Sequence, residues 1–111
     1  METSITLQQG ICIVNLSGRF DSFHVNTVRS TLAETRDQSV HVIVNLGVVN
    51  FMDSSAVAVL VNEMKHTRQH GGDVRLCELQ PTVKVIFELT RLDKAFKIFT
   101  TEVEAFESFS L

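Results

Sequence analysis

The sequence contains no tryptophan and no tyrosine, so apart from histidine its only aromatic residues are 8 phenylalanines. Tyr and Trp are favoured as interface anchors and as stacking platforms for bases. Positive charge is also scarce, because 10 Lys and Arg stand against 13 Asp and Glu, which gives a net charge of -3. The basic footprint that a phosphate backbone requires is missing, and we expect no direct contact with nucleic acid.

Long apolar runs are missing as well. No stretch approaches the roughly 20 apolar residues that cross a bilayer as a helix. The first residues, Met1-Glu2-Thr3-Ser4, carry neither a basic segment nor the apolar segment of a secretory signal. These absences predict a cytoplasmic protein without membrane insertion.

Cysteine is rare too. Cys12 and Cys77 are the 2 cysteines of the chain; they lie far apart in sequence, each inside an apolar stretch. This placement is typical of reduced core residues in a cytosolic protein rather than of a disulfide framework.

What the chain does contain is enough apolar material for a core. Hydrophobic residues make up 44% of the 111 residues, and no linker-like or low-complexity segment interrupts them. A chain of this length and composition predicts one domain, residues 1–111.

The first half of the chain predicts a hairpin, a helix and a strand. Residues 5–9 and 11–16 form two strand-like runs around a turn at Gln9-Gly10. Apolar residues recur at helical spacing after a polar loop, and a dense apolar strand follows. The expected elements are the loop 19–24, a helix over 25–36, a strand over 40–46 and a connection over 47–52.

The second half continues the alternation. Asp53 opens a helix that runs to about His70, and Gly71-Gly72 terminates it. Pro81 stands at the first position of a third helix, and Thr101 begins a capping box for a C-terminal one carrying Phe109. The remaining elements are a strand over 74–79, a turn over 92–96 and a short strand over 97–99. Strands that alternate with helices after a hairpin predict an α/β fold with a mixed sheet.

Most catalytic patterns are absent. His66 and His70 lie four apart on the second helix, but no third ligand is nearby in sequence, so a solvated helix face is the favoured interpretation. Neither glycine-rich phosphate-binding pattern occurs, and we expect no nucleotide cofactor and no metal. Ser54 or Ser55 could act as a nucleophile with Asp53 and a histidine, yet the sequence has no G-x-S-x-G turn to support it.

The remaining candidate for a functional site is the segment Asp53-Ser54-Ser55 at the start of an apolar helix. Asp and Ser are common N-cap residues, so a purely structural role is the simplest interpretation. However, one cap residue suffices and three candidates are present. The preceding residues 48–52 are unusually apolar for a loop, and exposed apolar residues beside a hydroxyl would suit a docking surface.

These segments resemble, in order, those of STAS domains, the family of anti-anti-sigma factors (anti-sigma factor antagonists). The resemblance spans nearly the whole chain. It rests on Gly18-Arg19-Phe20-Asp21, on Asn45-Leu46 and the run 49–60, on Gly71-Gly72 with Val74-Arg75-Leu76, on Pro81-Thr82-Val83-Lys84, and on residues 89–92.

The resemblance implies an α/β STAS-like single domain, a mixed sheet of about five strands packed against about four helices. It also implies partner switching. The unmodified protein binds an anti-sigma factor that is a serine kinase, and this releases the sigma factor. The kinase phosphorylates the first serine after the aspartate, here Ser54, with Ser55 as the secondary candidate, and a PP2C-type phosphatase reverses the reaction. In this scheme the chain is a ligand and a substrate, with no catalytic residues and no cofactor.

The resemblance also implies a partner-binding surface. Its residues are Asp21, Ser22, Phe51, Met52, Asp53, Ser54, Ser55 and Ala56. Ala56 departs from the family, which usually has Gly there, and its extra methyl is expected to tighten the helix start or to hinder the kinase.

Three alternatives stay open. The same fold serves in stressosome-like assemblies and as a subunit of transporters. A small enzyme that uses Ser54 with a histidine would belong to a different class, and labelling by a fluorophosphonate probe would reveal it. A small-ligand binder would hold its ligand between helix and sheet.

Overall fold

A computed structural model describes residues 1–109. Its five-stranded sheet has the order β1-β2-β3-β4-β5, with β1 antiparallel to β2 and the other neighbours parallel. The strands are β1 (Glu2–Gln8), β2 (Ile11–Phe20), β3 (His41–Met52), β4 (Asp73–Cys77) and β5 (Ile98–Phe99). The helices are α1 (Val25–Thr35), α2 (Ser54–Gln69), α3 (Pro81–Leu89) and α4 (Glu102–Glu107), with 3-10 turns η1 (Ser22–His24) and η2 (Leu92–Lys94). The predicted mixed sheet of about five strands and four helices is confirmed.

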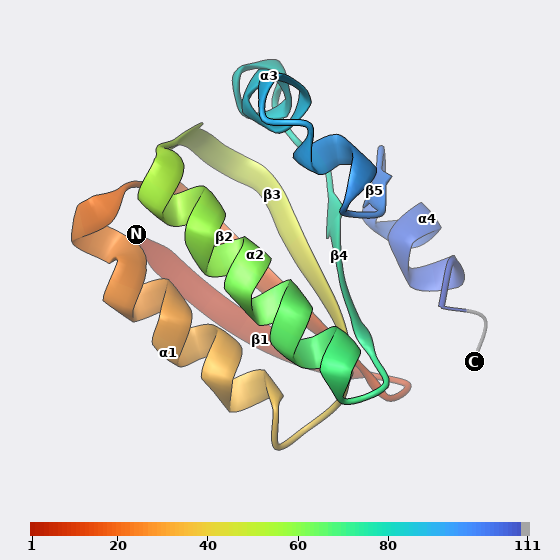
Figure 1. The fold of residues 1–111 in the computed structure, drawn as a ribbon. Coiled ribbons are helices and arrows are strands. Elements are labelled where there is room, and N and C mark those ends of the chain that lie inside the picture. Colours follow the sequence, from red (N-terminus) through yellow and green to blue (C-terminus); the bar gives the residue numbers. More distant parts are fainter. Residues whose placement is uncertain (110–111) are drawn as a thin grey trace.

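The helices cover the sheet unequally (Figure 1). α1 and α2 lie side by side on one face, and their apolar side chains join those of β2, β3, β4 and α3 in the main core. α4 packs on the other face, where Ala105 and Phe109 contact a smaller cluster with Ile13, Ile43 and Cys77. The helices therefore cover both faces of the sheet, and they turn toward it the apolar sides predicted from their sequence spacing.

Several element boundaries agree with the sequence. α1 and α2 begin and end within about a residue of the predicted positions, and Pro81 stands in the first turn of α3. Gln9 and Gly10 both have positive φ, as a two-residue hairpin turn requires. The Thr101 hydroxyl accepts a hydrogen bond from the N–H of Glu104, which confirms Thr101 as the N-cap of α4. The Glu104 carboxylate accepts from the Thr101 hydroxyl, so only the N-cap half of the predicted capping box is formed. Phe109, expected on α4, lies beyond its end but is buried.

The predicted connection over residues 47–52 is wrong, because this segment continues β3. β2 also continues past its predicted end at Leu16, through two register shifts, to Phe20. Ser17 then pairs with Val48, and Phe20 with Met52. Pairing between β2 and β3, which are distant in sequence, thus extends both strands through segments whose local sequence had predicted loops.

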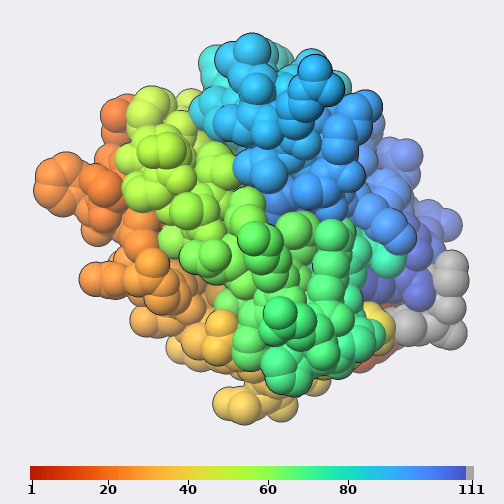
Figure 2. All heavy atoms as spheres, in the orientation of Figure 1, coloured from red at the N-terminus to blue at the C-terminus, as the bar shows by residue number. Residues whose placement is uncertain are grey.

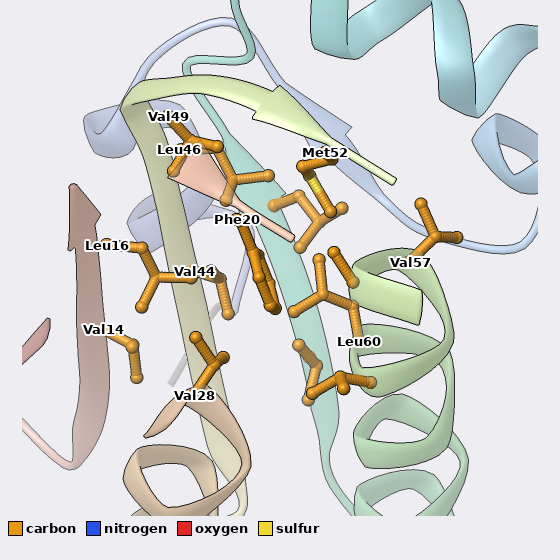
Figure 3. Close-up of a cluster of buried hydrophobic side chains, with 14 of the residues drawn as sticks. Val14, Leu16, Phe20, Val28, Val44, Leu46, Val49, Met52, Val57 and Leu60 are labelled. Atoms are coloured by element: carbon orange, nitrogen blue, oxygen red, sulfur yellow. The ribbon is translucent and has the colours of Figure 1, made fainter. Parts of the chain in front are cut away.

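The expectation of an exposed apolar loop before Asp53 is corrected in the same way. Strand alternation buries Val49 and exposes its neighbour Val48. The register shift between Gly18 and Arg19 leaves Asn50 without a partner in β2 and interrupts the alternation, so Met52, three positions after Val49, is fully buried in the same core. Figure 3 shows Phe20, Val49 and Met52 converging with Leu60 of α2 in the main core. The ends of β2 and β3 are therefore anchored by buried side chains, which fixes the loops that follow them.

The two cysteines are free and buried, on opposite faces of the sheet. Burial raises the pKa of the Cys12 thiol, and burial together with the charges of Glu102 and Glu78 raises the pKa of Cys77 to about 12. Because only the thiolate is nucleophilic, we expect neither thiol to react with Ellman's reagent in the native protein at mildly alkaline pH. Both should react in guanidinium chloride; rapid labelling of the native chain would contradict their burial.

Candidate functional site

The candidate site lies where β2 and β3 end. The two strands are parallel neighbours, so their carboxyl ends meet at one edge of the sheet. β2 leads into η1 and β3 leads into α2, which places the turn 21–24 beside the first turn of α2. The Ser22 N–H donates a hydrogen bond of 3.0 Å to Asp53 Oδ2 and so ties the two segments together. The structure thus brings the predicted loop residues and the predicted helix start into one site.

Asp53 organises the start of α2. Its Oδ1 accepts hydrogen bonds from the Ser55 hydroxyl at 2.6 Å and from the Ala56 N–H at 2.9 Å, while Oδ2 accepts from Ser22. Asp53 is therefore the N-cap of α2, as the simplest sequence interpretation expected, and it also holds η1. The donors, with Ser55 and Ala56 foremost, keep the pKa of Asp53 below its ordinary value of 3.8.

Asp21 organises the turn in a similar way. Its Oδ1 accepts from the Phe23 N–H at 3.1 Å and lies 2.8 Å from His24 Nδ1, and its Oδ2 accepts from Arg19 Nε at 3.0 Å. The Arg19 guanidinium lies 3.7 Å above the ring of Phe51. Burial alone would raise the pKa of Asp21, but the hydrogen bonds from His24, Arg19 and Phe23 outweigh it and lower that pKa.

The two serines differ in accessibility. Ser54 is the first residue of α2, its side chain is exposed, and its hydroxyl makes no hydrogen bond within residues 1–109. Ser55 is half-buried and its hydroxyl is committed to Asp53. Of the two predicted acceptors, Ser54 is thus the one whose hydroxyl is free for an incoming group.

Three residues of the predicted partner surface are buried, and two of them lie in the apolar core. Met52 is 1% exposed and Ala56 is 0% exposed, and both belong to the main core. The Ala56 methyl points away from solvent, so it is not in position to obstruct access to the Ser54 hydroxyl. Phe51 and Asp53 are half-buried, whereas Ser22 is exposed. Asp21 is buried against its hydrogen-bond donors.

Sequence reasoning missed Phe23. Its ring is 90% exposed at the centre of η1, between two residues that hydrogen-bond into the site. The signal for it was an apolar ring placed between two polar residues, Ser22 and His24, in the predicted loop 19–24.

The described residues bring no histidine to either serine. Within residues 1–109, no histidine hydrogen-bonds Ser54 or Ser55, and the His24 ring is engaged with Asp21. In the same range no three His, Cys, Asp or Glu side chains gather as a metal shell would require. Nor is any helix of this part of the chain both long and apolar enough to span a bilayer.

We expect Asp53→Ala to destabilise the protein by about 1 kcal/mol, because α2 loses its cap and η1 its tether. Acid should act through the same group. A carboxylate with a lowered folded pKa stabilises the fold fully above its ordinary value of 3.8, and this contribution is lost as the pH falls through the folded pKa. Urea unfolding of wild type and Asp53→Ala at neutral pH measures the first effect, and unfolding of wild type and Asp53→Asn across the acid range measures the second. Asp53→Asn should show the weaker, though not abolished, acid dependence, since Asp21 also contributes; identical pH profiles of wild type and Asp53→Asn would contradict this role.

Comparison with known proteins agrees with this fold. The family model described as STAS domain matches residues 2–105. The anti-sigma F factor antagonist of Paenibacillus polymyxa is 33% identical over 99 residues, which cover 87% of this chain and 85% of the relative.

Solved structures share the fold. An anti-sigma factor antagonist from Mycobacterium paratuberculosis superposes with a TM-score of 0.88 at 21% identity, covering 96% of this chain and 92% of its own. SpoIIAA of Bacillus has been solved with and without its phosphoryl group. At 22% identity the phosphorylated form gives a TM-score of 0.75 and the unphosphorylated form 0.83. They cover 97% and 98% of this chain, and 99% and 96% of their own. The family match and the fold together show that this chain belongs to the STAS domain family.

Proposed function

We propose that this chain is an anti-sigma factor antagonist that works by partner switching. In its unmodified state it binds an anti-sigma factor with serine kinase activity, so that the sigma factor is released. Phosphorylation of Ser54 ends the interaction, and a PP2C-type phosphatase restores it. The chain is then a cytoplasmic ligand and substrate rather than an enzyme.

The observation that carries this proposal is the contrast between the two serines. Ser54 is exposed and its hydroxyl is free, at the first position of a 16-residue helix, while Ser55 is tied to Asp53. The similarity to a named anti-sigma factor antagonist over most of both chains supports the proposal. So does the fold shared with SpoIIAA, a protein that exists in phosphorylated and unphosphorylated forms.

The position of Ser54 also suits a reversible anion. The first N–H groups of a helix lack partners within the helix, and the helix dipole favours negative charge there. A phosphoryl group adds about -1.5 to -2 charges at neutral pH. The modification therefore leaves the fold intact, and its effect falls on the partner.

A phosphorylation assay tests the proposal. The anti-sigma factor kinase, purified from the source cells by its activity on this chain, should transfer one phosphoryl group from ATP to Ser54. Ser54→Ala should accept none, whereas Ser55→Ala should still accept it, and a manganese-dependent PP2C phosphatase should remove it. Mass spectrometry of the digested protein locates the group. A phosphoryl group found elsewhere in the chain would overturn the assignment to Ser54.

A further inference from the structure

We propose that Phe23 is the anchor by which the anti-sigma factor kinase holds this chain, its ring filling an apolar pocket of the kinase beside the surface that meets Ser54. This inference rests on the proposed function and deepens it. It assigns the main contact to a residue outside the phosphorylated helix.

The first support is the exposure of the ring. Phe23 is 90% exposed, the highest fraction of any large apolar residue in the part of the chain that the structure describes. Figure 2 shows the orange segment that contains η1 protruding from the surface beside the light-green first turns of α2. Burying a phenyl ring is strongly favourable, and aromatic residues are enriched where proteins bind one another.

The second support is the rigidity of the turn. The N–H groups of Ser22 and Phe23 donate to Asp53 and Asp21, and the His24 N–H donates to the Asp21 carbonyl. Each backbone N–H of η1 is thus used to hold its shape. A ring held on a fixed turn loses less conformational entropy on binding than one on a mobile loop.

The third support is that the two carboxylates of the site are already paired within the chain. The carboxylates of Asp21 and Asp53 each accept three hydrogen bonds within the chain. Covering polar groups that are already paired costs little desolvation. Of the groups that the site offers a partner, the Phe23 ring is the large apolar one and the Ser54 hydroxyl is the one that reacts; the exposed Ser22 and Arg19 side chains lie beside them.

The neighbouring helix surface fits the same partner. Ser54, Ala58 and Val61 follow one another on one face of α2, and the first two are exposed. Glu63, the first charged residue of the helix, is buried and paired with Arg36. The first two turns of α2 therefore present a small, uncharged surface that a partner can approach closely.

A binding experiment tests the inference. The probe is the purified kinase that phosphorylates Ser54, mixed with the full chain in the absence of ATP. Phe23→Ala should weaken binding about 30-fold or more, the effect of losing an interface hot spot. Val103→Ala is the matched control, because Val103 is also exposed, at 65%, but lies on α4 at the other face of the sheet. It should bind as wild type does.

Kinetics and crosslinking give independent readouts. Phe23→Ala should raise the KM for phosphorylation of Ser54 and leave kcat unchanged, as expected for a contact made equally in the ground and transition states. Replacing Phe23 with p-benzoylphenylalanine should crosslink the chain to the kinase under ultraviolet light, and the same replacement at Val103 should not. Melting temperatures should be unchanged throughout, since the ring is exposed.

The outcomes separate the two proposals. If Phe23→Ala binds the kinase as tightly as Val103→Ala does, Phe23 is not the anchor, irrespective of whether Ser54 is phosphorylated. If instead Ser54→Asp binds as tightly as Ser54→Ala, the switch itself is wrong, and crosslinking from position 23 would then describe an interface with another role.

Discussion

Ser54→Asp should weaken binding to the anti-sigma factor kinase by about 30-fold to several thousand-fold relative to Ser54→Ala. The reason is the cost of leaving a charge poorly paired at an interface that accepted a neutral hydroxyl, about 2 to 5 kcal/mol. The neighbouring Asp53 carboxylate adds to the negative charge that the partner must accept. Isothermal titration or surface plasmon resonance with the purified kinase measures the difference.

The fold should tolerate this substitution. An aspartate at the first position of α2 interacts favourably with the helix dipole, so the melting temperature should be unchanged or slightly higher than in the Ser54→Ala variant. Ser55→Ala controls for damage to the helix start, because it removes the hydrogen bond to Asp53 without adding charge. Equal affinities of Ser54→Asp and Ser54→Ala would rule out a charge-driven switch at this position.

Gly72→Ala should destabilise the protein by at least about 3 kcal/mol, although the substitution adds a single methyl group. A Cβ at Gly72 would meet the carbonyl carbon and oxygen of Val40 at less than the van der Waals distance. That oxygen accepts a 2.9 Å hydrogen bond from the Asp73 N–H, so it cannot move without disturbing the start of β4.

Gly71→Ala is the matched control for this prediction. Gly71 has a φ of +85°, but a Cβ there would meet no atom within 4 Å. The substitution should therefore cost only the strain of the left-handed conformation, about 1 to 2 kcal/mol. Urea unfolding of both variants measures the two values, or shows that Gly72→Ala does not fold. A Gly72→Ala variant as stable as Gly71→Ala would contradict the close approach to Val40.

The two glycines also mark a limit of sequence reasoning. The sequence predicted that Gly71-Gly72 ends the second helix, and α2 does end just before the pair, at Gln69. Local composition predicts a helix end because left-handed backbone favours glycine. The local composition around Gly72 cannot reveal the contact with Val40, because Val40 is distant along the chain. Only packing distinguishes a glycine required for its backbone angle from one required for lack of space.

By itself the sequence determined the alternation of strands and helices, the helix boundaries and the position of Ser54 after an N-cap aspartate. These features depend on residues a few positions apart, through periodicity, capping and turn preferences. The tertiary structure decided the rest. Pairing with β2 made residues 47–52 a strand and buried Met52, and the Ser22–Asp53 hydrogen bond joined two loops 31 residues apart. Contacts of this kind join segments that are distant along the chain, so no local sequence pattern predicts them. These contacts leave the Ser54 hydroxyl free and the Phe23 ring exposed.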